Sequence, residues 1–135
     1  MVGSWLELVR FGKDGLVPAV VQEASSGRVL MLGYMNREAL ELTASRGRVH
    51  FWSRSRKELW CKGETSGHVQ KVLEMRLDCD GDALLVMVEQ AVAACHTGHQ
   101  SCFFRALKGE SWQDVDPLVF DPKQVYGEEK NRQLT

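Results

Sequence analysis

The segment RLDCDGDALL, residues 76–85, places three aspartates at alternate positions around one cysteine. Asp78, Asp80 and Asp82 concentrate three negative charges, and a hard dication such as magnesium, which prefers oxygen ligands, would relieve their repulsion. An EF-hand calcium loop is excluded, because its sixth position requires glycine and is Ala83 here, and because an apolar run follows instead of a polar loop. The remaining alternative to a magnesium site is an ordinary hairpin tip with solvated carboxylates.

The four cysteines are the second group that could do chemistry. The N-terminus lacks the basic-then-apolar layout of a signal peptide, so metal binding or catalysis is favoured over disulfides. Cys95 and Cys102 are separated by six residues, which does not match the C-x2-C spacing of common zinc modules. Together with Cys79, which fifteen residues separate from Cys95, they would suit a zinc site that leaves a fourth position for water. A buried or redox-active set of thiols is the alternative, and Cys61 beside Trp60 is expected to be a packing residue.

His96 lies directly after Cys95 in the segment CHTGHQSC. Imidazole has a pKa near 6.5 and exchanges protons at neutral pH, so we predict that His96 is a general acid or base. The alternative is a simple loop histidine.

Residues 62–67, KGETSG, combine a lysine with glycine-flanked hydroxyl groups, which can bind a phosphate through backbone N–H groups and side chains. The order of residues is not that of a P-loop. With SRSRK at 53–57, this segment predicts an anion pocket. The predicted substrate contacts are one residue from SRSRK, four from KGETSG and one from the cysteine segment: Arg54, Lys62, Glu64, Thr65, Ser66 and Thr97.

Charge is unevenly distributed in this chain of 135 residues. The net charge is -1, which argues against a general nucleic-acid binder, and no apolar run is long enough to span a membrane. Residues 37–76 carry nine Lys/Arg and five Asp/Glu, whereas residues 77–135 carry five Lys/Arg and ten Asp/Glu. We therefore expect a cytoplasmic protein that binds a phosphorylated small molecule and a divalent metal in neighbouring regions; solvated faces are the alternative.

The first half of the chain predicts two strands and a helix. Residues 16–24 and 28–35 are β-rich and flank the turn signal SSG, which indicates an antiparallel hairpin. Asn36 is a suitable helix N-cap, and good helix formers continue to Gly47 at a C-cap position.

Further strands are expected at 48–55, 58–63, 69–79 and 83–90. In the third of these, apolar residues alternate with polar ones, which predicts that Leu73, Met75 and Leu77 share one face with Cys79. The Asp80-Gly81 pair predicts a two-residue type I′ turn before 83–90. The polar tail at 123–135 is expected to be partly mobile.

Several segments together resemble the phosphoribosyl-AMP cyclohydrolases of histidine biosynthesis. The segments that carry the resemblance are VLMLGYMNREAL, HFWSRSRKELWCKGETSGHVQ, RLDCDGDALLVMVEQ and ACHTGHQSCFF. The family usually has basic residues at the positions of His99 and Gln100, so this chain departs from it there. The resemblance implies a single cyclohydrolase domain at 1–122, with a mainly β (α+β) fold: an antiparallel β pseudo-barrel with a helix, intertwined as a homodimer.

The resemblance also implies the reaction and the metals. The reaction is hydrolytic opening of the adenine ring of 1-(5-phosphoribosyl)-AMP between nitrogen 1 and carbon 6. The implied zinc ligands are Cys79 from one subunit and Cys95 and Cys102 from the other, and the implied magnesium ligands are Asp78, Asp80 and Asp82. The rival hypothesis is a zinc-stabilised binding module without catalysis.

Overall fold

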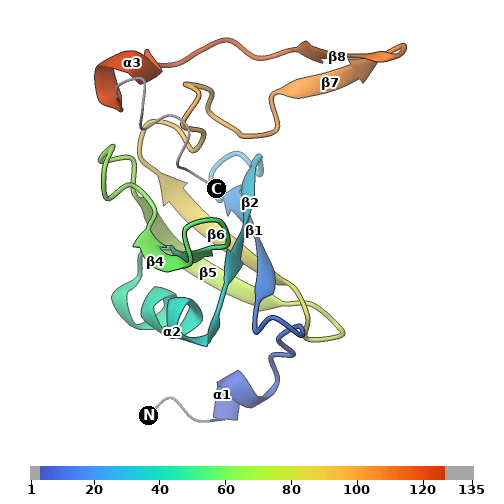
Figure 1. The fold of residues 1–135 in the computed structure, drawn as a ribbon, viewed down its shortest axis with the longest axis vertical. Helices are drawn as coiled ribbons and strands as arrows, with labels where there is room; N and C mark the ends of the chain where they lie inside the picture. The colour runs from blue at the N-terminus through green and yellow to red at the C-terminus, as the bar shows by residue number, and fades with distance from the viewer. Residues whose placement is uncertain (1–3, 127–135) are drawn as a thin grey trace.

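The computed structural model describes residues 4–126, and its centre is a four-stranded sheet (Figure 1). The strand order is β2 (Val29–Met35), β1 (Val17–Glu23), β6 (Leu84–Gln90) and β5 (Gln70–Leu77). β1 and β2 pair antiparallel, as do β5 and β6, which confirms both predicted hairpins. β1 and β6 pair in parallel, so the sheet is mixed, and this central pair departs from the mainly antiparallel arrangement that the resemblance implied. The pseudo-barrel and the homodimer stay predictions.

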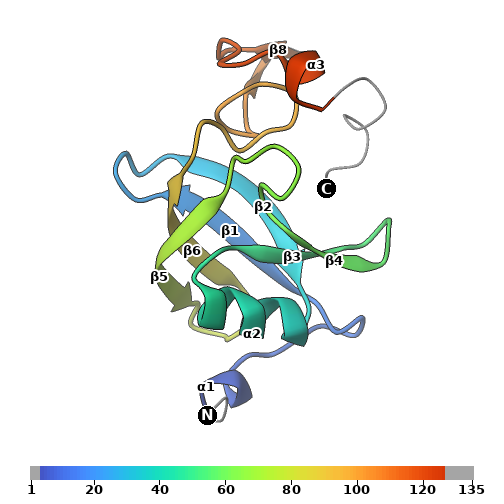
Figure 2. The ribbon, with the colours of Figure 1, turned by 90° about the vertical axis from the view of Figure 1, so that its left-hand side faces the viewer.

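The predicted helix is confirmed as α2 (Arg37–Arg46), and both of its ends are capped. The Asn36 side chain accepts a hydrogen bond from the Ala39 N–H at 2.8 Å, which satisfies one of the free donors of the first turn. Gly47 has a φ of 71°, and its N–H donates to the Thr43 carbonyl, which ends the helix. α2 and the following hairpin lie on the same side of the sheet (Figure 2).

That hairpin consists of β3 (His50–Ser53) and β4 (Glu58–Cys61), which pair antiparallel as expected. Phe51 is 1% exposed and its ring centroid lies 5.1 Å from that of Trp60. A Cβ atom on Gly33 would lie 2.5 Å from the Phe51 ring, so the absence of a side chain at Gly33 lets β2 approach this hairpin. The hydrophobic core therefore joins the hairpin to the sheet.

The remaining elements lie at the two ends of the described chain. The sequence did not predict β7 (Arg105–Lys108) and β8 (Ser111–Asp114), which form a fourth hairpin, separate from the sheet and with mostly exposed side chains. Short helices occur at Ser4–Glu7 (α1) and Pro122–Val125 (α3). Within residues 4–126, no helix is long and apolar enough to cross a membrane.

Candidate metal and catalytic site

A tight loop after β6 brings two of the predicted zinc ligands together. The Ala94 N–H donates to the Gln100 carbonyl at 2.8 Å, and the Cys95 N–H donates to the His99 carbonyl at 3.2 Å. The chain therefore turns back on itself, and the Cys95 and Cys102 thiols hydrogen-bond to each other. Residues 91–104 are called the cysteine loop below.

The two thiols have opposite tendencies to ionise. The hydrogen bond from Cys102 lowers the pKa of Cys95 to about 5, and a contact with the Thr97 hydroxyl, 2.8 Å from the Cys95 sulfur, acts in the same direction. The same pairing with Cys95, together with burial, raises the pKa of Cys102. One thiolate and one thiol within hydrogen-bond reach fit zinc, since two sulfurs bound at about 2.3 Å in a tetrahedral site are about 3.8 Å apart.

Two long polar side chains hold the cysteine loop against the sheet. The Lys62 ammonium is buried and donates to the Ala94 carbonyl, next to Cys95. The Gln90 amide donates to the Ala91 carbonyl at 3.0 Å and the Ala93 carbonyl at 3.3 Å. The same amide donates at 3.1 Å to the His68 carbonyl, so it links the loop to the segment after β4. The thiols are thus placed by a fixed backbone.

His96 is half-buried beside the thiols. Burial lowers the pKa of its imidazole, the Cys95 charge opposes that shift, and the charge of Lys62 adds to it. The loop therefore favours the neutral imidazole, which can accept a proton, at this predicted general base.

Three aromatic side chains cover the loop, and the sequence reading assigned none of them to the site. The His68 and Phe120 rings meet edge to face with centroids 4.8 Å apart, and Tyr126 lies 6.2 Å from Phe120. The Tyr126 hydroxyl shares a hydrogen bond with Ser66, and the thiol charges help to raise the pKa of Tyr126 after burial. The Asp121-Pro122 pair, an N-cap followed by proline at the first helical position, was the available signal for the short helix that delivers Tyr126. Residues 127–135 of the predicted mobile tail lie outside the described residues.

The predicted substrate contacts fall into separate groups. Lys62 and Thr97 have hydrogen-bond partners in the cysteine loop, and Ser66 shares a hydrogen bond with Tyr126 beside it. Glu64 and Thr65 are exposed in the loop after β4. Arg54 is placed elsewhere: its guanidinium lies 4.0 Å from the Tyr34 ring centroid, at the turn end of the β3–β4 hairpin. β4 spans four residues, about 13 Å, so the structure separates Arg54 from the other predicted contacts by that length.

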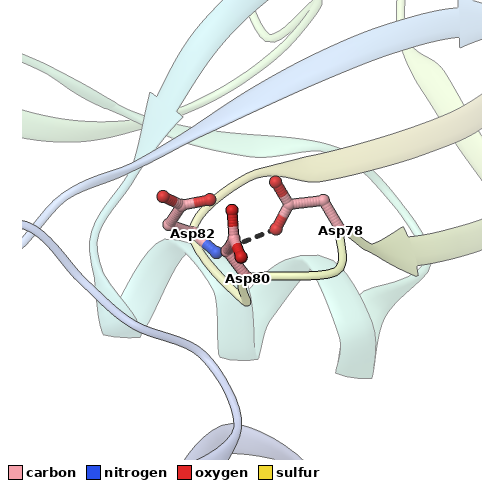
Figure 3. A group of neighbouring side chains, drawn as sticks. All are labelled: Asp78, Asp80 and Asp82. Atoms are coloured by element: carbon pink, nitrogen blue, oxygen red, sulfur yellow. Dashed lines mark hydrogen bonds between the residues drawn. The ribbon is translucent and has the colours of Figure 1, made fainter.

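The three aspartates gather at the β5–β6 turn (Figure 3), at the opposite end of β6 from the cysteine loop (Figure 1). Their ligand oxygens lie within 4.8 Å of one another, and all three side chains are exposed. Asp78 accepts the Asp82 N–H at 2.9 Å and the Ala83 N–H at 3.3 Å. Burial acts to raise the pKa of Asp78, but the hydrogen bonds that its carboxylate accepts, chiefly from Asp82, together lower that pKa. The hydrogen bond and charge of Asp78 in turn raise the pKa of Asp82. The cluster offers carboxylate oxygens of the kind that magnesium prefers.

The turn itself differs from the expected type I′ geometry. The last paired residues are Leu77 and Leu84, and the Gly81 N–H donates to the Asp78 carbonyl at 3.1 Å. Cys79 and Asp80 are thus central in a wider turn, so the prediction of a two-residue turn is wrong. Asp78 explains the difference, because its carboxylate accepts backbone N–H groups inside the loop.

The predicted alternation in β5 also needs correction. The pairing with β6 shifts between Val72 and Glu74, and Leu73 is 54% exposed, whereas Met75 and Leu77 pack against the core. The irregularity turns Leu73 away from the face that the sequence predicted. Cys79 lies beyond the strand and is exposed, so strand alternation does not fix its direction.

Comparisons with known proteins agree with the resemblance seen in the sequence. The family model described as phosphoribosyl-AMP cyclohydrolase matches residues 31–104. A phosphoribosyl-AMP cyclohydrolase of Pseudomonas fluorescens is 56% identical over 124 residues, which cover 91% of this chain and 93% of that protein. One from Nitrosospira multiformis is 54% identical over 129 residues, covering 95% of this chain and 99% of that protein. The chain therefore belongs to the phosphoribosyl-AMP cyclohydrolase family.

Proposed function

We propose that this protein is a zinc-dependent hydrolase that opens the adenine ring of 1-(5-phosphoribosyl)-AMP, the third step of L-histidine biosynthesis. Water delivers its oxygen to carbon 6, which becomes a carboxamide, and the bond from carbon 6 to nitrogen 1 breaks. One proton goes to nitrogen 1 and one to the exocyclic nitrogen, so atoms balance and no redox partner is needed. The product is the phosphoribosyl-formimino-aminoimidazole carboxamide ribotide.

The single observation that carries this proposal is the juxtaposition of Cys95, Cys102 and His96 in a chain that belongs to this family. Two sulfurs within hydrogen-bond reach are a soft donor set that suits zinc. A bound zinc ion would supply Lewis acidity, lowering the pKa of a coordinated water toward about 7. His96 is held beside that position and in its neutral form, where it accepts the proton that the attacking water loses.

The distance of Cys79 from the Cys95 and Cys102 pair supports a zinc site shared between two subunits. Cys79 lies at one end of β6 and Cys95 beyond the other, and β6 spans seven residues, about 20 Å. A single zinc ion cannot bind both from one chain, because its sulfur ligands lie about 2.3 Å from the metal. A homodimer in which Cys79 of one subunit completes the Cys95 and Cys102 pair of the other solves this geometry.

Exposed apolar side chains offer surface for such a dimer. Trp112 is 67% exposed, and its cross-strand partner Leu107 is 57% exposed. Phe103, inside the cysteine loop, is 57% exposed. Large apolar side chains grouped in this way are typical of protein interfaces.

The aspartate cluster is proposed to hold magnesium, with Asp78, Asp80 and Asp82 as candidate ligands. In the shared arrangement the adjacent Cys79 would carry this cluster to the other subunit's zinc half-site, beside the substrate. Glu64, Thr65, Ser66 and Thr97 are proposed to contact the nucleotide there, and Arg54 is proposed to contact a phosphate.

The test is an ultraviolet absorbance assay of ring opening with purified protein and phosphoribosyl-AMP. We expect turnover, its loss after treatment with a zinc chelator, and its recovery when zinc is added back. Metal analysis should give one zinc per chain, and the molecular mass in solution should be that of a dimer. A protein that binds zinc but shows no chelator-sensitive ring opening would instead be a zinc-stabilised binding module.

The role of His96 has its own test. His96→Ala should lower turnover by about 100-fold, within the usual range for losing a general base, while zinc content stays unchanged. His50→Ala is the matched control, because His50 lies in β3 and is not part of the cysteine loop. Unchanged turnover of His96→Ala across pH 6 to 9 contradicts the assignment.

A further inference from the structure

Lys62 is a buried cation without a carboxylate partner. Its side chain is almost fully enclosed, with the residue 3% exposed, and its ammonium donates to the neutral carbonyl of Ala94. None of the five ion pairs formed within residues 4–126 includes it. Burying an ammonium is unfavourable unless an opposite charge lies nearby, so the fold must supply that charge in another form.

The groups that can carry such a charge are the two cysteines of the cysteine loop, Cys95 as it stands and both when they bind a metal as thiolates. Burial lowers the pKa of Lys62, and the charges of Cys102 and then Cys95 oppose that shift. The carbonyl that accepts the hydrogen bond from Lys62 belongs to Ala94, which directly precedes Cys95. The Trp60 ring adds an apolar face, with its centroid 5.8 Å from the ammonium. The ammonium is thus buried beside an aromatic ring and against the loop that carries the two sulfurs.

We infer that Lys62 is a positioning residue that supplies the counter-charge of the Cys95 and Cys102 thiolates and so holds this half of the site ready for zinc. The inference rests on the proposed function for the identity of the metal. It also replaces the sequence-based expectation that Lys62 contacts a substrate phosphate, since the ammonium is buried and donates to the backbone carbonyl that precedes Cys95.

Charge balance explains why a lysine is useful at this position. Three thiolates and one zinc ion would sum to a charge of -1, and one ammonium neutralises that sum. The balance matters most where water is excluded, because charges interact more strongly in a low dielectric. An exposed lysine would be screened by solvent, and Lys62 is not exposed.

The fold fixes the position of this charge from both ends of the residue. The Lys62 backbone N–H donates to the Val49 carbonyl at 2.9 Å, directly after β4. Its ammonium donates to the cysteine loop, which includes Val92 at a φ of 58°. A β-branched residue in this left-handed region is strained, so the loop needs such external contacts to keep its shape.

The test compares Lys62→Met, a neutral side chain of similar length, with Lys62→Arg, which keeps the charge. Zinc affinity is measured by competition with a chromophoric chelator, and the melting temperature of each metal-free protein is measured alongside. Lys71→Met is the control, because Lys71 is an exposed lysine in β5.

For Lys62→Met we expect zinc binding at least tenfold weaker than in the wild type, with a metal-free melting temperature close to the wild-type value. Lys62→Arg should recover most of the affinity, and Lys71→Met should be unchanged. Wild-type zinc affinity in Lys62→Met overturns the inference, as does an equal loss in Lys62→Arg accompanied by a large fall in both metal-free melting temperatures. If the wild-type protein itself binds no zinc, the proposed function fails first, and the two failures are therefore distinguishable.

Discussion

The two ends of β6 carry the two parts of the proposed zinc site, and they are built in different ways. At the end near Gln90, the cysteine loop is enclosed, and Cys95 is buried among fixed hydrogen bonds. At the end near Leu84, the aspartate turn is open, and Cys79 is exposed with no neighbouring thiol among residues 4–126. One chain thus prepares a binding pocket at one end and presents a single ligand at the other.

This difference teaches how a small chain can make a metal site that depends on assembly. In the proposed dimer, the buried end would supply two ligands in a fixed geometry, and the exposed end would supply the third ligand to the second copy. In such a design, damage at the two ends should have different consequences: a change at the cysteine loop should affect the folded chain itself, whereas a change at the aspartate turn should affect only the assembled site.

The largest expected effect comes from removing one ligand at each end. Cys79→Ser and Cys102→Ser should each lower activity by more than about 100-fold, since outer-shell changes alone cost 10- to 100-fold in metal sites. Co-expressed in equal amounts, the two inactive variants should recover about a quarter of wild-type activity. Random pairing makes half of the dimers mixed, and each mixed dimer has one intact site of two.

This recovery is measured by the ring-opening assay on the co-purified mixture. The control is a mixture of Cys95→Ser with Cys102→Ser, which lose ligands from the same half-site and should stay inactive. Equal recovery in both mixtures, or none in either, would contradict a zinc site shared between subunits.

A smaller effect is expected from loosening the buried end. Gln90→Ala leaves several enclosed carbonyls without their donor, and we expect a loss of about 1–3 kcal/mol in the free energy of unfolding, measured with urea. Glu89→Ala, its exposed neighbour, should change stability by less than about 0.5 kcal/mol. Equal stability of the two variants would mean that Gln90 does not fix the cysteine loop.

At the exposed end, Asp80→Asn tests the magnesium proposal. We expect magnesium affinity to fall by about tenfold, because one of three candidate carboxylates loses its charge. The melting temperature of the metal-free protein should not fall, since this change also relieves repulsion with Asp78 and Asp82. Glu110→Gln, an exposed carboxylate in the β7–β8 turn, is the control; an identical magnesium titration for both variants would remove the proposed site.

The smallest effect concerns acid stability at the buried end. Burial, and then the charge of Lys62, lower the pKa of His68, so the folded protein binds this proton more weakly than the unfolded chain. The contribution of neutral His68 to the free energy of unfolding is therefore complete above about pH 6.5, the pKa in the unfolded chain. It is lost as the pH falls toward and through the lower pKa of His68 in the folded protein. His68→Asn should therefore lose less stability than the wild type between pH 7.5 and 5.5 in urea unfolding; parallel losses would exclude this contribution.

Local signals in the sequence predicted much of the fold. Asn36 and Gly47 delimited α2 because capping depends on residues close in the chain, and both predicted hairpins follow from short turns between apolar runs. The parallel pairing of β1 with β6 has no such local signal. The wide turn at Asp78 was missed because its carboxylate overrode the usual preference of an Asp-Gly pair.

For the site, residue chemistry was easier to predict than residue environment. The pairing of Cys95 with Cys102 followed from the cysteine segment and the family resemblance, and the structure brings those thiols together. The burial of Lys62 could not be predicted, because lysine is usually exposed and only the packing of Trp60 and the loop encloses it. Tyr126 was missed because it lies in a polar segment and reaches the site through long-range packing.

The parallel pairing of β1 with β6 also sets an order of events during synthesis. Val20 pairs with Leu85, so a ribosome must add 65 residues after the first strand before its second neighbour exists. At about 5–20 residues per second, the nascent β1 strand waits about 3–13 seconds for this second neighbour. The cysteine loop follows β6, so in the proposed site zinc could bind its two sulfurs only after the last strand of the sheet has been made. Zinc binding by a newly made chain would therefore indicate that all four strands of its sheet have already been synthesised.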